Sequence, residues 1–266
     1  PPVILKNKKI FKPFEFFVDM YGLPAYDEMD PTTLVAIVYT LLFGIMFGDV
    51  GQGIVVSIIG YFMWKLKRIT LGKILIPCGI SSAIFGTIYG SVFGLENLLD
   101  GFYNKVFGLA EKPIDVMNPN TTIIIMGTSI GLGIVLIMIS MIINIISSLK
   151  RKKYGNALFG PNGICGLMFY SSLIIGFAIQ LAFNIKVITL PYIIVFIIIP
   201  LVCILFQDML GKLVSGDKNW KPESLGDYLL ENIFEMFEVL LSYLSNTISF
   251  LRVSTYILVH AGMMLS

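Results

Sequence analysis

The chain has 266 residues, of which 56% are hydrophobic and only 14% are charged, and its mean hydropathy is +0.84. This composition excludes a soluble globular domain of that length and predicts an all-α, multi-pass transmembrane helix bundle. The net charge of +2 says little by itself, because the useful quantity is where the charges fall along the sequence.

Residues 1–31 are expected to form a cytoplasmic or interfacial lead-in, followed by a transmembrane domain over residues 32–266. The chain opens with two prolines and no methionine, so we expect it to be a piece of a longer or processed protein. Seven apolar segments are expected to cross the membrane as helices. They cover residues 32–47, 51–66, 72–95, 121–148, 164–185, 188–210 and 229–266.

The first two segments are separated only by the sequence FGDVGQG, residues 47–53. One long helix over 32–66 with a break at its middle is the alternative to a tight hairpin. The hairpin is favoured, because the lysines that follow residue 64 then fall on the side of the membrane where the other basic residues gather.

Basic residues alternate strongly between the two sides of this topology. Lys and Arg accumulate in cytoplasmic loops, and fifteen of them fall in the lead-in and in the loops after the second, fourth and sixth segments, against three in the other loops. We therefore expect a cell-membrane protein with a cytoplasmic N-terminus, whose seventh helix runs outward.

Small residues and cysteines add little about function. Glycines four residues apart, Gly44 with Gly48, Gly86 with Gly90 and Gly94, and Gly127 with Gly131, predict close contacts between helices. Three cysteines lie in apolar segments, and we expect reduced thiols with no disulfide or metal role. They are Cys78, Cys165 and Cys203.

The last segment carries a stripe of polar side chains along one face. Its sequence NTISFLRVSTYILVHAG, residues 246–262, contains an arginine among apolar residues and the only histidine of the chain. With Arg252 as zero and 100° per residue, the stripe spans about 80°. Its members are Ser245 near +20°, Glu238 and Tyr256 near +40°, Glu231 and Ser249 near +60°, and Ser242 and His260 near +80°.

Arg252 is the principal candidate functional residue. It lies about 21 Å along the helix axis from Glu238, too deep to reach the cytoplasmic interface easily, and an arginine at mid-membrane is costly enough that function is the default inference. The alternative is an arginine that pairs with a carboxylate only to fix packing. The main acids of the other segments, Asp49 and Asp208, lie near helix ends. A partner from another subunit is therefore expected.

Four further residues each have a functional and a structural interpretation. His260 lies about 12 Å outward from Arg252 and is either a proton relay or channel lining, or a core histidine bonded to a carbonyl. The helix dipole explains Glu231 and is also the structural interpretation of Glu238. Because Glu238 lies deeper, on the Arg252 face, function is favoured there. Asp49 either caps the next helix or lines a channel.

Two stretches resemble a known family. PFEFFVDMYGLPAYDEMDPT with FGIMFGDVGQG near the start, and LSNTISFLRVSTYILVHAGM at the end, resemble the membrane half of the stator subunit of rotary V-type and A-type ATPases, called subunit a or subunit I, in its prokaryotic branch. The resemblance implies eight transmembrane helices after a large cytoplasmic domain, so we expect the domain and the eighth helix to be missing here. Gln52 stands where many relatives have histidine.

The resemblance also implies roles and partners. Arg252 matches the family's essential arginine, His260 its histidine, Glu238 the acid fourteen positions earlier and Asp49 the acid of the FGD motif. These residues would translocate H⁺ or Na⁺ where the chain faces a carboxylate of a rotating proteolipid ring. The other implied partners are the peripheral stalk, further subunits of the rotary ATPase, and the lipid bilayer. We expect no cofactor, no metal ion and no nucleic acid partner.

ATP chemistry is expected elsewhere in such a complex. The sequence has no phosphate-cradling glycine loop followed by Lys-Ser/Thr, so this subunit would be a transport component and not itself a catalyst. The alternative function is a self-contained secondary transporter or ion channel, against which a lone mid-membrane arginine counts. A structural scaffold is the third interpretation, and it predicts that Arg252 can be replaced.

Overall fold

The computed structural model describes residues 3–95, 98–106 and 114–266, and the regular elements in these residues are helices, apart from a single β-bridge between Val92 and Leu95. The expected all-α class is confirmed. The chain forms two compact units. Unit 1 comprises Pro1–Ile130 and Phe250–Ser266, and unit 2 comprises Gly131–Ser249.

Unit 1 begins with the lead-in, which packs on the first long helices. A 3₁₀ turn, Lys12–Phe14, leads into α1 (Glu15–Tyr21), and α2 spans Thr32–Met46. Asp30 starts α2 by accepting hydrogen bonds from the backbone N–H and hydroxyl of Thr32. Phe14 is buried in a small apolar core with Ala36, Ile74 and Cys78, so the lead-in is anchored to the bundle.

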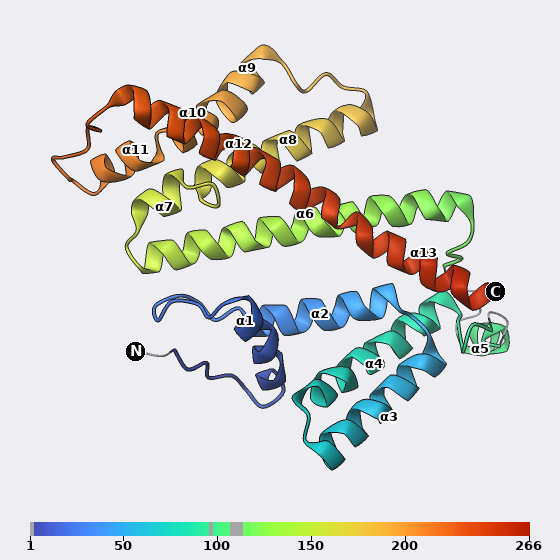
Figure 1. The fold of residues 1–266 in the computed structure, drawn as a ribbon. Coiled ribbons are helices and arrows are strands. Elements are labelled where there is room, and N and C mark those ends of the chain that lie inside the picture. The colour runs from blue at the N-terminus through green and yellow to red at the C-terminus, as the bar shows by residue number, and fades with distance from the viewer. Residues whose placement is uncertain (1–2, 96–97, 107–113) are drawn as a thin grey trace. The chain divides into compact units, whose positions relative to one another are not determined.

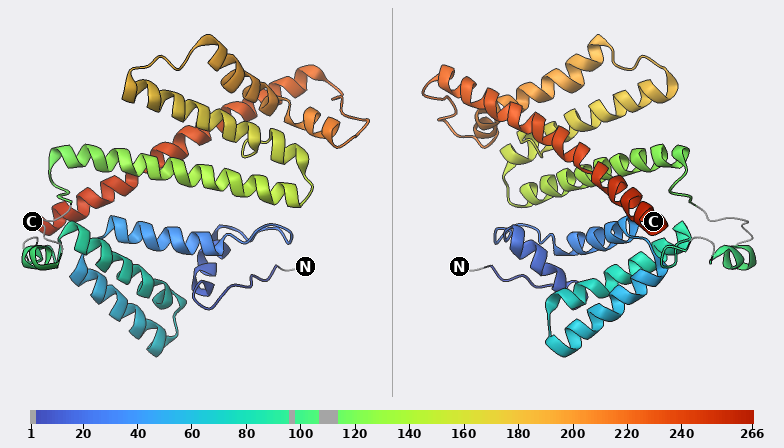
Figure 2. Two further views of the ribbon diagram at one scale, coloured as in Figure 1. Left: turned by 180° about the vertical axis from the view of Figure 1, so that it is seen from behind. Right: turned by 45° about the vertical axis from the view of Figure 1, so that its right-hand side comes forward.

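The break between the first two apolar segments lies at residues 47–49. α3 spans Val50–Lys67, and Asp49 before it is extended, with φ −149° and ψ 124°. The two segments are therefore two helices with a break between them, a feature that both the tight hairpin and the alternative of one long helix broken at its middle contain. α4 (Thr70–Tyr89) returns along α3, and the two lie side by side in every view (Figures 1 and 2).

Three of the expected glycine contacts explain how closely α4 packs. A Cβ built on Gly44 of α2, on Gly48 in the connection or on Gly86 of α4 would fall within 3.0 Å of the neighbouring segment. For Gly86 the nearest atoms are backbone atoms of Asp49 and Val50, which cannot move aside like a flexible side chain. Gly90 and Gly94 differ from the prediction, because both lie beyond the end of α4 at positive φ.

Gly86→Ala is therefore expected to destabilise the protein by about 2–3 kcal/mol, because the added methyl group overpacks a backbone contact. Gly127→Ala is the matched control, since that glycine also lies in a helix but meets no atom within 4 Å, and it is expected to change stability little. Thermal unfolding of the purified full-length variants in detergent measures both. Equal effects would show that α4 does not approach the connection this closely.

The remaining helices of unit 1 form a second core. α5 spans Asp100–Val106, the first part of α6 (Pro119–Lys150) belongs to this unit, and α13 spans Leu251–Leu265. Val116, Val253 and Ile257 are buried there, with Met46 and Tyr89 packed against them. One face of α13 is thus held against α2 and the end of α4.

Unit 2 contains the rest of α6 and the helices up to α12. These are α7 (Tyr154–Phe159), α8 (Ile164–Phe183), α9 (Leu190–Ile193), a π-helical turn (Ile194–Ile198), α10 (Ile199–Leu205), α11 (Gln207–Val214) and α12 (Leu225–Ser249). Met141, Phe169, Tyr170 and Tyr243 form its buried core. The Tyr170 and Thr247 hydroxyls hydrogen-bond at 2.7 Å, which fixes the inward face of α12.

All seven expected segments are helical, with corrected ends. Among the described residues, four helices are long and apolar enough to cross a membrane, and a fifth counts if Leu190–Leu205 and α11, bent by 81°, form one span. The 15-residue α2 is shorter than those spans, and α3 carries Gln52 and two terminal lysines. Residues 90–95 are not helical, because Gly90 ends α4 in the left-handed conformation.

Candidate functional site

The polar stripe of the last segment is divided by a break at Phe250, between α12 and α13. On α12 the stripe faces away from the unit 2 core: Glu231, Glu238, Ser242 and Ser245 are exposed, and Ser249 is half-buried. On α13, Arg252 and Tyr256 are exposed as well. The apolar residues beside the stripe, Leu241, Ile248 and Val259, are also exposed, so most of this face is unpacked against the described residues of its own unit.

Arg252 projects from α13 on the side opposite its packed face. Its neighbours Val253 and Ser254 are only 3% and 2% exposed, whereas Arg252 itself is exposed. Within the described residues of unit 1, its guanidinium forms no ion pair and no side-chain hydrogen bond. The alternative in which Arg252 pairs with a carboxylate of its own unit therefore finds no partner among them.

His260 differs from the rest of the stripe because it is buried. Its ring lies edge-on to Phe47, with 5.8 Å between ring centroids. Its Nε2 atom is shielded from solvent and has no hydrogen-bond partner among the described residues, so the core interpretation, a histidine bonded to a carbonyl, is not met at this nitrogen. His260, Tyr89 and Ser91 line a cavity of about 30 Å³, which is large enough for one water molecule.

Asp49 is fully buried and its carboxylate is saturated with hydrogen bonds. It accepts from the backbone N–H of Gln52 at 2.9 Å, which is the predicted cap of α3. It also accepts from the Ser91 hydroxyl at 2.7 Å, and from the N–H groups of Phe93 at 2.9 Å and Gly94 at 3.0 Å. The carboxylate thus ties the α2–α3 connection to the loop after α4.

These hydrogen bonds determine the ionisation of Asp49, which lies in the connection outside both helices. Burial raises the pKa of the carboxyl, but the four hydrogen bonds lower it by more, so its pKa lies below the ordinary value. The group is therefore a stable carboxylate at neutral pH. The loop that it holds includes Ser91, which also lines the cavity beside His260, so Asp49 positions one wall of that cavity.

Sequence reasoning missed the partners that make this arrangement. The apolar segment 72–95 predicts a helix through Ser91 and residues 93–94. Gly90 and Gly94 are the sequence signal for a turn there. Gln52, in doubt at the sequence level, donates its side-chain amide to the Met264 sulfur at 3.2 Å. It therefore links α3 to the end of α13.

Metal binding finds no support in the part of the chain that the structure describes, where no group of three His, Cys, Asp or Glu side chains could hold an ion. All three cysteines are free thiols.

Comparison with known proteins decides the family. Residues 1–94 match the model of the V-type ATPase 116 kDa subunit family. The A-type ATP synthase subunit I of Methanocaldococcus jannaschii is 31% identical over 211 residues, which cover 68% of this chain and 29% of that protein. The chain belongs to the subunit a/subunit I family of V-type and A-type ATPases.

Further relatives, one bacterial and one archaeal, support the assignment. The V-type ATP synthase subunit I 2 of Treponema pallidum is 30% identical over 57% of this chain and 37% of its own length. The A-type ATP synthase subunit I of Archaeoglobus fulgidus is 40% identical over 35% of this chain and 14% of its own. The chain therefore spans less than two fifths of the length of these relatives.

Proposed function

We propose that this chain is the ion-translocating part of a rotary ATPase stator, in which Arg252 faces the carboxylates of a proteolipid rotor ring. The observation that carries the proposal is the exposed Arg252 on α13, a helix that contains no acidic residue, with no acid paired to it among the described residues of its unit. A charged side chain that lies in the hydrocarbon of a membrane without a partner is costly in free energy. A carboxylate from a second subunit removes that cost.

The guanidinium acts as an electrostatic gate. An ionised ring carboxylate cannot enter lipid cheaply, whereas its protonated or cation-bound form can. A fixed positive charge at the stator favours the ionised form, so each arriving ring site releases its ion there. The same charge blocks a direct leak of cations between the two half-channels. The free-energy change is about 2.3 kcal/mol for each elementary charge that crosses a potential of 100 mV. Rotation couples this free energy to ATP hydrolysis or synthesis in the rest of the complex.

The two half-channels use opposite ends of the stripe. The exposed acids and hydroxyls of α12, with Glu238 deepest, are proposed to line the cytoplasmic path with Glu231, Ser242, Ser245 and Ser249. Tyr256 and His260 are proposed to line the outer path, where the unpaired Nε2 and a cavity of one water's size suit proton transfer. Asp49 contributes by holding the loop that borders this cavity.

The topology and the assembly belong to the same proposal. The N-terminus and the lead-in of residues 1–31 face the cytoplasm, the domain of residues 32–266 lies in the cell membrane, and the complete protein contacts the peripheral stalk. ATP is bound by other subunits.

A cross-linking experiment on the complete complex tests the proposal. In a background with Cys78, Cys165 and Cys203 replaced by serine, Ser245→Cys is expected to form a disulfide with a cysteine engineered beside the rotor carboxylate. Thr247→Cys is the control, because Thr247 faces the unit 2 core through its bond to Tyr170, and it should not cross-link. A chain that copurifies with no proteolipid and moves ions alone in liposomes would instead be a self-contained transporter.

A further inference from the structure

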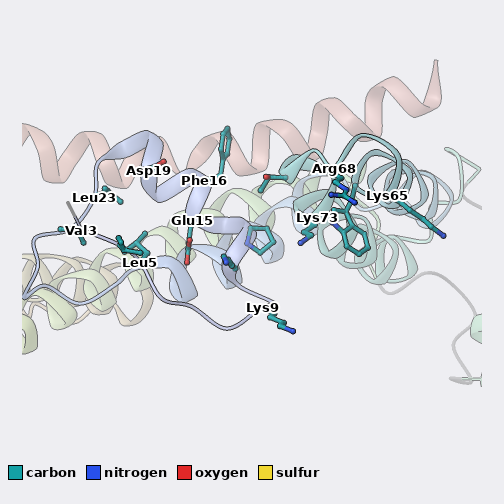
Figure 3. A pocket seen from close by; sticks show the side chains of 15 residues that line it. Val3, Leu5, Lys9, Glu15, Phe16, Asp19, Leu23, Lys65, Arg68 and Lys73 are labelled. Carbon is teal, nitrogen blue, oxygen red and sulfur yellow. The ribbon is translucent and has the colours of Figure 1, made fainter. Parts of the chain in front are cut away.

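A large basic pocket lies away from the polar stripe, between the lead-in and the turn that joins α3 to α4. Its volume is about 1160 Å³, and the residues that line it fall within 3–23 and 64–73. Figure 3 shows Arg68 and Lys73 at the α3–α4 end of the pocket and Glu15 and Asp19 on α1. All lining residues belong to unit 1, and none has a part in the proposed ion path.

Positive charge dominates the lining. Five cations, Lys9, Lys12, Lys65, Arg68 and Lys73, line the pocket with only two carboxylates. Of the two, Glu15 already accepts a hydrogen bond from the Asn7 amide at 2.9 Å. Among the described residues none of the five cations forms an ion pair. The pocket therefore favours an anionic ligand.

Exposed aromatic side chains lie in and beside this pocket, next to its cations. Trp64 lines it and is 39% exposed, and the Lys73 ammonium lies 5.0 Å from the centre of the Trp64 ring. One turn earlier, Tyr61 is 42% exposed, with the Lys65 ammonium 5.5 Å from its ring. Exposed Trp and Tyr beside Lys and Arg are typical of the lipid headgroup region.

A second pocket, which is apolar, is also lined by the lead-in. It has a volume of about 600 Å³ and is lined mainly by apolar residues of the lead-in, α2 and α4. The two pockets share the lead-in as a wall: Lys9, Lys12 and Phe16 line the first, and Ile10, Phe11 and Phe14 line the second.

One face of α4 carries residues of both pockets. Lys73 of the basic pocket is followed by Pro77, Ile80 and Ile84 of the apolar pocket at spacings of four, three and four residues, which lie on one side of a helix. Ile80 and Ile84 are 53% and 58% exposed. A ligand that lies along this face would contact the Lys73 ammonium at one end and the apolar side chains of Ile80 and Ile84 at the other.

We propose that this face binds one anionic phospholipid, with its phosphate headgroup in the basic pocket and a hydrocarbon tail along α4 in the apolar pocket. A free phosphate would leave the apolar pocket unused, and an acidic peptide would not match its apolar lining. The lipid would clamp the lead-in to the α3–α4 pair. This site is independent of the proposed ion path, because it shares no residue with the polar stripe.

Native mass spectrometry of the complete purified complex, titrated with phosphatidylglycerol or phosphatidylcholine, tests the site. Replacing both Arg68 and Lys73 with glutamine is expected to weaken phosphatidylglycerol retention about 30-fold, since each cation near an anionic lipid contributes about fivefold. Lys150→Gln with Lys153→Gln removes two basic residues outside the pocket and should leave retention unchanged. Arg68→Lys with Lys73→Arg keeps the charge and should retain the lipid, which separates charge loss from misfolding.

Four results would overturn the proposal. Equal losses in the pocket variant and the control would mean non-specific attraction. Displacement of the lipid by soluble glycerol phosphate at similar concentration would mean a phosphate site without a tail. Undiminished retention in the pocket variant, or an acidic segment of a partner subunit found in the pocket instead, would remove the lipid from it. Selective loss with phosphatidylglycerol but not with phosphatidylcholine would support it.

Discussion

Replacing Arg252 with glutamine is expected to abolish ATP-driven ion uptake into liposomes by the reconstituted complex, while the complex still assembles. Glutamine keeps most of the length and the hydrogen-bonding capacity of the side chain but not the charge. Because Arg252 is exposed on α13 and its neighbours Val253 and Ser254 fill the packed face, the substitution removes no buried contact within unit 1. Stability should therefore change by less than about 0.5 kcal/mol.

The size of the effect follows from the role of the charge. Without it, a ring carboxylate has no reason to lose its ion at the stator, and cations can pass between the half-channels without rotation. ATP hydrolysis is then uncoupled from transport or stalls. Arg252→Lys keeps a charge but lacks the planar fork that can hold a carboxylate through two hydrogen bonds, so we expect partial uptake.

Thr255→Val is the matched control, since Thr255 is exposed on α13, lies outside the polar stripe and carries no charge. Its uptake should remain much closer to wild type than that of Arg252→Gln. Uptake near wild type in an assembled Arg252→Gln complex would reduce Arg252 to a packing residue and support a scaffold role for the chain.

The helices were predictable because hydropathy and helix length are local properties of the sequence. The seven apolar segments are all found as helices, since backbone groups in hydrocarbon must be bonded within their own segment. The ends were less predictable: residues 90–95 are as apolar as the helix before them, but Gly90 at φ 73° ends α4. Hydropathy cannot detect such a stop, whereas paired glycines can.

The candidate site was predictable only where it depends on a helical period. The exposed face with Glu238, Ser245 and Arg252 follows from 100° per residue. The burial of His260 does not, because it depends on Phe47 and Tyr89, which lie far away in the sequence. The full set of Asp49 partners was equally hidden, since three of its four donors come from residues more than forty positions away.

Asp49→Ala is expected to destabilise the protein by about 4 kcal/mol or more, and to reduce assembly of the complex. The change leaves the N–H groups of Gln52, Phe93 and Gly94 and the Ser91 hydroxyl without their acceptor in part-buried positions, and an unsatisfied donor costs about 1–3 kcal/mol where water cannot reach it. Asp27→Ala is the control, because Asp27 is exposed, and it should change little. Thermal unfolding of the complete protein in detergent measures both.

The isosteric Asp49→Asn separates the two interpretations of this residue. An amide keeps one acceptor oxygen but turns an NH₂ group toward donors, so we expect about half the destabilisation of alanine. Because the folded-state pKa of Asp49 is lowered, its stabilisation is present at neutral pH and is lost as the pH falls through that pKa. The stability gap between wild type and Asp49→Asn should therefore narrow in acid. If Asp49 positions the loop beside His260, assembled Asp49→Asn complexes transport ions nearly normally. Loss of transport with stability unchanged would instead assign the carboxylate to the ion path itself.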